Sequence, residues 1–400
     1  MFATLRQSAS VLALLSSIST TLAVPTSDHQ QIKYLNWSTA KFTGVNLGGW
    51  FAQEAFIDPY FWSTNCGTLP DEWTCCLALG SKCGAVLEHR YSTYITRHDI
   101  DKLASAGVNL LRIPTSYAAW AKIPGSALYS GNQQAVFKHI SEYAIKKYGM
   151  HVVLDIHSLP GGINGVDIGE AKGHYDWFNN ATNLAYSLEV VSSALEFIQS
   201  SCSPQSYTLA PINEPVDNRD PSTFGQTIAL SENGADWVQK YFEAVIKKRD
   251  QVNPRIPLML QTSFKGAAYW SNRLQSFTKR NLVLDVHQYY FAGRPVTSAN
   301  VSSLICSDAK AVAANSSFPV FVGEWAIQTV SGNAFADRRK NLNTGLYAWK
   351  KYAQGSAYWT ARMSGNVSVV GEGVQGDYWN FEGFVDMGYV HEEEGKKYCD

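Results

Sequence analysis

Eight short apolar runs, separated by segments with helical periodicity, constrain the fold of this chain more than any other feature. Such runs are typical of strands that are buried on both faces of a parallel sheet. They occupy residues 42–50, 109–114, 151–157, 207–215, 257–262, 281–290, 319–325 and 356–363. Apolar residues at helical spacing mark segments between them, at 98–106, 134–148, 184–199, 234–252 and 341–353. Eight strands alternating with helices predict an α/β fold, a single (β/α)8 TIM barrel.

Two segments, 51–84 and 364–382, do not fit this repeat. Each follows the end of a predicted strand, and TIM barrels place their active sites at the C-terminal ends of the strands. We therefore expect both segments to overhang the catalytic face. Because no internal repeat or low-complexity linker divides the chain, we expect a leader at 1–23 and one catalytic domain at 24–400.

The first 23 residues have the pattern of a secretory signal peptide. A single basic residue, Arg6, precedes an apolar stretch at 11–15, and small residues follow up to Ala23, near which we expect cleavage. No later segment is apolar for long enough to span a bilayer. The sequence therefore predicts a soluble, secreted (extracellular) protein. Five glycosylation sequons fit an exported glycoprotein: Asn36, Asn180, Asn300, Asn315 and Asn366.

Seven cysteines in an exported chain favour disulfides, and the odd number leaves at least one cysteine without an intrachain partner. Four of them crowd one stretch, where no histidine stands at zinc-ligand spacing, so we expect disulfides and no metal or other cofactor. The pairing within this group stays open. Cys306 and Cys399 are candidate partners, and Cys202 is the candidate free thiol. The crowded four are Cys66, Cys75, Cys76 and Cys83.

The charge balance argues against anionic partners. The formal net charge of −1 becomes about −2 once Arg6 is removed, and the Lys and Arg residues are scattered along the chain. We expect no nucleic-acid or membrane partner, and a monomer or a weak oligomer. The informative excess is aromatic: 12 Trp and 21 Tyr can fill a core, or they can stack on sugar rings and flat aglycones.

Two glutamates close apolar runs, Glu214 in YTLAPINEP and Glu324 in PVFVGEW. A carboxylate pair at the rim of a barrel is typical of glycoside hydrolysis. The ends of other predicted strands carry polar and aromatic residues, and polar groups are costly to bury. Each of these residues, taken alone, could have a purely structural role. Together on one rim they predict a functional site. They are Trp50, Arg112, His157, Asn213, His287, Tyr289 and Trp359.

The ordered set GVNLGGW, LLRIP, DIHSLPGG, APINEP, DVHQYY, GEW and YWTARM resembles glycoside hydrolase family 5 over essentially the whole mature chain. The resemblance implies that Glu214, on strand four, is the general acid/base and that Glu324, on strand seven, is the nucleophile. It further implies substrate-binding and orienting residues. Asn213 would hold the sugar 2-hydroxyl, Trp359 would form the sugar platform, Glu54 would accept a hydroxyl, and the carboxylates would be oriented by Arg112, His157, His287 and Tyr289.

A retaining glycosidase needs one neutral and one ionised carboxyl group. Arg112 and Tyr289 near Glu324 would favour its ionised form. Glu214, beside the neutral amide of Asn213 and in the negative field of Glu324, is expected to keep its proton.

Two branches of the family compete for the substrate. The start GVNLGGWFAQE resembles secreted exo-β-1,3-glucanases, but the loop from His157 to Gly165 and Ala55 after Glu54 depart from their pattern. The segments DEWTCCLALGSKCGAVLEHRYSTYI and RIPTSYAAW resemble the rutinosidase branch, which releases rutinose from flavonoid glycosides such as rutin. The resemblance thus favours a rutinosidase, with an exo-β-1,3-glucanase as the alternative. A non-catalytic sugar-binding barrel is a remote alternative, because both carboxylates are present.

A flavonoid rutinoside requires a second sugar site and an apolar slot for a flat aglycone. The overhanging segments supply aromatic candidates that could build this slot or anchor the loops: Phe56, Tyr60, Phe61, Trp62, Tyr175, Trp177, Phe178, Tyr378 and Trp379. The Gly-rich stretch 161–173 lacks the Lys-Ser/Thr of a nucleotide loop, and no lipase-type, zincin or haem motif occurs.

Overall fold

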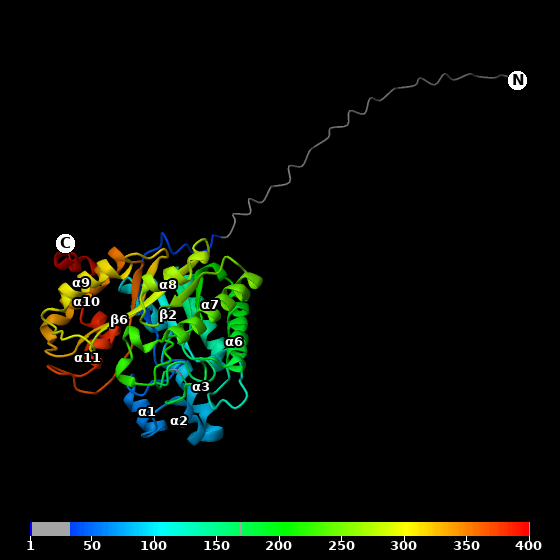
Figure 1. Cartoon of the computed structure of the whole chain (residues 1–400), viewed down its shortest axis with the longest axis horizontal. Helices are drawn as coiled ribbons and strands as arrows, with labels where there is room; N and C mark the ends of the chain where they lie inside the picture. The colour runs from blue at the N-terminus through cyan, green and yellow to red at the C-terminus, as the bar shows by residue number, and fades with distance from the viewer. Residues whose placement is uncertain (2–32, 169, 400) are drawn as a thin grey trace. The chain divides into compact units, whose positions relative to one another are not determined.

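Eight parallel strands close into a barrel in chain order, with β8 pairing with β1 (Figure 1). This computed structural model describes residues 1, 33–168 and 170–399. The predicted (β/α)8 barrel is confirmed, while the predicted leader lies, apart from Met1, outside the described residues. The strands are β1 Phe42–Asn46, β2 Leu110–Thr115, β3 His151–Ile156, β4 Tyr207–Ala210, β5 Leu258–Gln261, β6 Leu282–Tyr290, β7 Val320–Thr329 and β8 Gly355–Tyr358.

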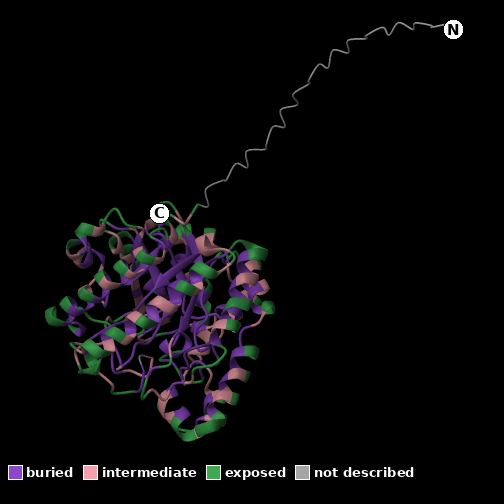
Figure 2. Cartoon of the chain, turned by 90° about the vertical axis from the view of Figure 1, so that its right-hand side faces the viewer, coloured by how far each residue is buried: buried purple, intermediate pink, exposed green. Residues whose placement is uncertain are grey.

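Helices pack around the barrel with buried inner faces and exposed outer faces (Figure 2). Five of them overlap the segments with predicted helical periodicity: α4 Arg97–Ser105, α5 Gln133–Tyr148, α6 Ala181–Ser200, α7 Glu232–Val252 and α10 Arg338–Tyr352. α8 Ala267–Arg273 and α9 Val301–Val312 complete the alternation after β5 and β6. No helix in the described part of the chain is long and apolar enough to cross a membrane.

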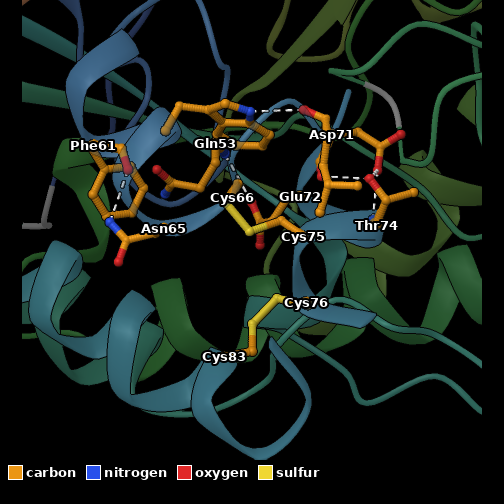
Figure 3. The surroundings of a disulfide bond; sticks show 12 residues. Gln53, Phe61, Asn65, Cys66, Asp71, Glu72, Thr74, Cys75, Cys76 and Cys83 are labelled. Atoms are coloured by element: carbon orange, nitrogen blue, oxygen red, sulfur yellow. Dashed lines mark hydrogen bonds between the residues drawn. A yellow bond between two sulfur atoms is a disulfide. The ribbon is translucent and has the colours of Figure 1, made fainter. Parts of the chain in front are cut away.

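The segment after β1 contains three helices that the periodicity did not predict: α1 Pro59–Asn65, α2 Glu72–Leu79 and α3 Cys83–Thr93. They are fixed by end caps and disulfides instead of by one apolar stripe. Asp58 and Asp71 cap the N-termini of α1 and α2. Cys66–Cys75 joins the two helices, and Cys76–Cys83 joins α2 to α3 (Figure 3).

A third disulfide, Cys306–Cys399, holds α13 (Lys396–Cys399) against α9. The predicted partnership of these two cysteines is confirmed. Cys202 is the free cysteine of the described residues and is exposed, as predicted.

Side chains inside the barrel change from apolar to polar along the strands. Near the N-terminal ends the interior holds an apolar cluster that includes Leu110 and Val153, and Trp37 packs against it. Alternate residues of a strand point to the same face, so the next inward positions on these strands are Arg112 and Asp155. Both are fully buried and lie 3.2 Å apart. The active site begins at this polar layer.

Candidate active site

Glu214 and Glu324 meet across the top of the barrel. Both side chains are buried, and a carboxylate oxygen of each lies within 4.8 Å of the other and of a ring nitrogen of His287. Glu324 does not end its strand, as the sequence suggested, because β7 continues to Thr329 after a register shift. Glu324 is paired with His287 on the neighbouring strand β6. Glu214 lies beyond β4 with φ at 45°, a left-handed conformation that is uncommon for non-glycine residues and that clusters at functional sites.

Two donors hold the Glu324 carboxylate. Nη1 of Arg112 donates to Oε1 at 2.8 Å, and the hydroxyl of Tyr289 donates to Oε2 at 2.8 Å. Burial raises the pKa of Glu324, the positive charges of His287 and Arg112 lower it, and Glu214 raises it, leaving it above 4.5. Burial and the charges of Glu324 and Glu214 also raise the pKa of Tyr289 well above 10, so its hydroxyl remains a donor. The neighbours expected for Glu324 are therefore in place.

Glu214 is paired with His287. Nδ1 of His287 lies 2.6 Å from Oε1 of Glu214, and Nε2 lies 3.3 Å from Oδ2 of Asp285. Burial lowers the pKa of His287, but the charges of Glu324, Asp285 and Glu214 outweigh it and raise this pKa well above 6.5. A 2.6 Å contact between these groups requires a proton between them. The proton expected on Glu214 is thus shared with an imidazole.

The side chain of Asn213 forms hydrogen bonds with Arg112 and His157. Its Oδ1 accepts from Nη2 of Arg112 at 2.7 Å, and its Nδ2 lies 3.3 Å from Nε2 of His157. The amide is therefore fixed in orientation, with its second N–H left for a substrate hydroxyl.

Arg112 is the cation around which the site is built. It is fully buried, donates to Asn46 Oδ1 at 3.0 Å and lies 3.2 Å from Asp155. Burial lowers its pKa, yet the surrounding carboxylates, Asp155 and Glu324 first, raise it overall. Arg112 thus remains charged and links Glu324 to Asn213.

His157 is hydrogen-bonded to Asp155 and Asn213, so any orienting effect on Glu214 and Glu324 acts through these neighbours. Its Nδ1 lies 2.7 Å from Oδ2 of Asp155, so Nδ1 carries a proton and Nε2 accepts from Asn213. Its ring stacks on Trp359, with centroids 5.7 Å apart and an angle of 16°. Trp359 follows β8 directly, and a Cβ added at Gly48 would lie 2.9 Å from a carbon of its indole.

Glu54, on the loop after β1, is buried, and its Oε1 has no hydrogen-bond partner among the described residues. Burial raises its pKa well above 4.5, and the charges of Glu324, Asp167 and Glu214 raise it further. A neutral carboxyl group can both donate to and accept from a hydroxyl. Its unpartnered oxygen fits the predicted contact with a sugar hydroxyl.

Trp50 does not face the site, although the sequence placed it on the rim. Its ring is fully buried against Phe51, and Nε1 donates to the carbonyl of Tyr91 at 2.8 Å. Trp50 instead joins the barrel to α3.

Some of the aromatic candidates for an apolar slot are loop anchors, whereas others gather beside Tyr289. Trp62, Trp177 and Tyr378 are buried anchors. Trp379 instead stacks on Tyr289, with centroids 5.3 Å apart and an angle of 22°, and also contacts Phe291 and Phe56 at 5.3 and 6.5 Å. We call Phe56, Tyr289, Phe291 and Trp379 the aromatic wall. It begins at the residue that holds Glu324 and ends at Phe291, which is 41% exposed.

Sequence reasoning missed Asn46, Asp155 and Asp285, which hold the site residues from below. The available signal was Asp-x-His on two strands, at 155–157 and 285–287, since residues two apart share a face. Oδ1 of Asp285 accepts from the amide of Gly323 at 2.9 Å, and a Cβ at Gly323 would lie 2.1 Å from this oxygen. Only glycine fits before Glu324.

Glu214, His287 and Glu324 are also the group of described residues whose ligand atoms lie close enough together to hold a metal ion. The proton required between Glu214 and His287 would compete with a metal for the same atoms. The geometry as it stands suits acid–base chemistry.

Comparison with known proteins gives a consistent picture. The family model for cellulase (glycosyl hydrolase family 5) matches residues 80–365. A probable glucan 1,3-beta-glucosidase A of Aspergillus niger is 29% identical over 304 residues, which are 75% of this chain and 67% of that protein.

Two solved structures are more similar. The crystal structure of AoRut is 57% identical, with a TM-score of 0.88, and the match covers 90% of this chain and 100% of the other. The crystal structure of a rutinosidase from Aspergillus niger is 52% identical, with the same TM-score and the same coverage.

Proposed function

Because the chain belongs to glycoside hydrolase family 5, we propose that it is a retaining β-glycosidase that releases the disaccharide rutinose from flavonoid rutinosides such as rutin. The observation that carries this substrate is the 52% identity to a rutinosidase over 90% of the chain. The separation of Glu214 and Glu324, within 4.8 Å, supports the retaining reaction, whose carboxyl groups lie about 5 Å apart.

In the first step a carboxylate oxygen of Glu324 attacks the anomeric carbon while the bond from this carbon to the leaving oxygen breaks. The proton shared by Glu214 and His287 passes to the leaving oxygen, and the aglycone departs with a hydroxyl group. Arg112 and Tyr289 hold the attacking carboxylate in place.

In the second step Glu214 takes a proton from water, and the water oxygen attacks the anomeric carbon of the glycosyl ester. The bond to Glu324 breaks, the sugar leaves with its original configuration, and the Glu214–His287 pair regains its proton. The His287–Asp285 contact keeps the imidazole in one orientation throughout.

Three residues of the site could bind the glucosyl unit, one through the sugar ring and two through its hydroxyl groups. Trp359 supplies a flat apolar surface for the ring, the free N–H of Asn213 suits the 2-hydroxyl, and Glu54 suits a more distant hydroxyl. We assign the aromatic wall to the aglycone, because a flavonoid is flat and apolar and because the exposed Phe291 packs on Tyr289, which holds Glu324.

The alternative, an exo-β-1,3-glucanase, is favoured by the likeness to glucan 1,3-beta-glucosidases, for example 29% identity to the protein from Aspergillus niger. Both enzymes would use the same carboxylates, so the substrate separates them. The test is to incubate the purified protein with rutin and, separately, with laminarin, and to identify the released sugars. Rutinose from rutin supports the proposal. Glucose from laminarin with rutin intact would replace it by the alternative.

We also propose that the protein is secreted after cleavage near Ala23, with 24–400 as the catalytic domain. Three disulfides support an oxidising compartment, and four of the five sequon asparagines, Asn36, Asn300, Asn315 and Asn366, are exposed. N-terminal sequencing of protein from the culture medium, before and after enzymatic removal of N-glycans, tests both points.

A further inference from the structure

We propose that Glu72, the first residue of α2, positions Glu54 for its contact with the sugar. This inference rests on the proposed function, because it deepens the role that Glu54 has in binding the glycone. Glu72 is a positioning residue, since it acts through the backbone that carries Glu54 and does not itself touch the substrate. None of the catalytic steps above uses Glu72.

A direct hydrogen bond joins Glu72 to the backbone next to Glu54. Oε2 of Glu72 accepts from the amide of Gln53 at 2.9 Å, and Gln53 immediately precedes Glu54 (Figure 3). All three residues are buried. Because a buried amide needs an acceptor, the place of the Glu72 carboxyl group determines where the chain runs at Gln53.

Two other hydrogen bonds shape the loop that carries Glu54. Nε2 of Gln53 donates to the carbonyl of Trp50 at 2.6 Å, and the amide of Ile57 donates to the carbonyl of Glu54 at 3.1 Å. Both of these contacts lie within the loop. The hydrogen bond between Gln53 and Glu72 instead ties the loop to α2, at the position directly before Glu54.

The helix that carries Glu72 is itself immobilised. Its two cysteines form disulfides with cysteines of the flanking helices, Cys66–Cys75 on one side and Cys76–Cys83 on the other. A carboxyl group on a helix that is fixed in this way keeps its acceptor oxygen in one place. The loop is therefore ordered before the sugar arrives, which reduces the cost of ordering it on binding.

Burying the Glu72 carboxyl group is costly, so its side-chain hydrogen bond needs a reason. Oε1 has no hydrogen-bond partner among the described residues, whereas Oε2 has the amide of Gln53. An apolar side chain would be cheaper to bury, but it would leave this amide without its acceptor. The carboxyl group offers the amide an oxygen in either protonation state, so an acceptor is what this position requires.

The test is a double-mutant cycle between Glu72 and Glu54, assayed with p-nitrophenyl β-rutinoside and p-nitrophenyl β-glucoside. Glu72→Met and Glu72→Ala both remove the acceptor, and the first keeps the length of the side chain. Each is made alone and together with Glu54→Ala, and Glu72→Gln, which keeps an acceptor oxygen, is the rescue variant. Thermal unfolding of every variant sets an assay temperature at which all of them are folded.

Thr74→Val is the matched control on the same helix. It removes a hydroxyl that donates to Oδ1 of Asp71 at 2.8 Å, and it leaves the amide of Gln53 paired with Glu72. A general weakening of α2 would therefore affect this control as well, whereas a loss of positioning would not.

We expect Glu72→Met and Glu72→Ala to raise KM about threefold to tenfold with kcat largely kept, because a binding contact is weakened while the dyad is intact. Glu72→Gln and Thr74→Val should keep the wild-type KM. In the Glu54→Ala background the Glu72 variants should have no further effect on KM, because the group that Glu72 positions is gone.

In an active wild type, three results would each overturn this inference alone. They are a wild-type KM in both Glu72→Met and Glu72→Ala, an equal rise in KM with and without Glu54, and a loss confined to kcat. A wild type that releases p-nitrophenol from neither substrate would overturn the proposed function and this inference with it.

Discussion

The hydroxyl of Tyr289 donates a hydrogen bond to Oε2 of Glu324 at 2.8 Å, while the ring of Tyr289 stacks on Trp379. One side chain thus joins Glu324 to the aromatic wall. The polar end holds the carboxylate that we propose as the nucleophile, and the apolar end forms part of the surface that we assign to the aglycone.

Removing this hydroxyl should slow the reaction without disturbing the fold. We expect Tyr289→Phe to lower kcat about tenfold to a hundredfold, because Glu324 loses one of two donors, with a smaller change in KM. Tyr290→Phe is the matched control, since the hydroxyl of Tyr290 donates to Asp308 at 3.0 Å on the other side of the strand. Steady-state kinetics of both variants check this, and equal kcat values for them would contradict the role of Tyr289.

The Glu214–His287 pair predicts a dependence on the leaving group. Glu214→Gln cannot supply a proton, so it should reduce kcat/KM strongly for substrates with poor leaving groups and much less for activated phenols. A series of aryl glycosides with phenols of increasing pKa checks this. A variant whose losses are uniform across the series would show that Glu214 is not the acid.

Glu72, a buried carboxyl group outside the Glu214–Glu324 pair, predicts that the fold is more stable at acidic than at neutral pH. Burial raises the pKa of Glu72 to about 7 from 4.5, against a lowering by the amide of Gln53. Between these values the folded state keeps a proton that the unfolded state has lost, so the free energy of unfolding falls as the pH rises. The loss is complete above about pH 7 and amounts to at most about 3 kcal/mol.

The measurement is urea unfolding of the wild type, Glu72→Gln and the exposed control Glu243→Gln at several pH values from acid to neutral. Glu72→Gln should flatten the decline in stability toward neutral pH, and Glu243→Gln should not. An identical pH dependence in the wild type and Glu72→Gln would refute this assignment.

The disulfides should differ in their value to stability. Cys306–Cys399 closes 93 residues and Cys76–Cys83 only 7. The chain-entropy relation gives a loss of about 4 to 5 kcal/mol for the first and about 2 kcal/mol for the second when both cysteines become serine. Thermal unfolding of the two double variants, with Cys202→Ser as a control, checks the order. A larger loss for the short loop would show that local strain or packing dominates.

The barrel and its dyad could be predicted from the sequence because buried parallel strands leave long apolar runs, and because a glutamate at the end of such a run is costly. The polar layer beneath was harder to see. Asp155 and Asp285 lie inside strands that otherwise look like core, and their partners come from other strands. The helices α1 and α2 escaped notice because disulfides and caps, not an apolar stripe, stabilise them.

Trp50 illustrates the opposite error. Its place after an apolar run suggested the rim, but the chain turns there, and the indole is directed into the core toward Tyr91. Strand periodicity gives the face of a residue only while the strand continues. The hydrogen bonds of His157 with Asp155 and Asn213 belong to the polar layer that the sequence did not reveal.

The most direct test of the account is to identify the residue that becomes covalently attached to the sugar. A 2-deoxy-2-fluoro-β-glucoside with a good leaving group slows both steps, so that a glycosyl-enzyme accumulates, and peptide mass mapping locates the modification. We predict one sugar per chain, on Glu324, with no adduct on Glu324→Gln. A label on any other residue, or turnover that inverts the anomeric configuration and forms no adduct, would contradict the assignment of Glu324 as nucleophile.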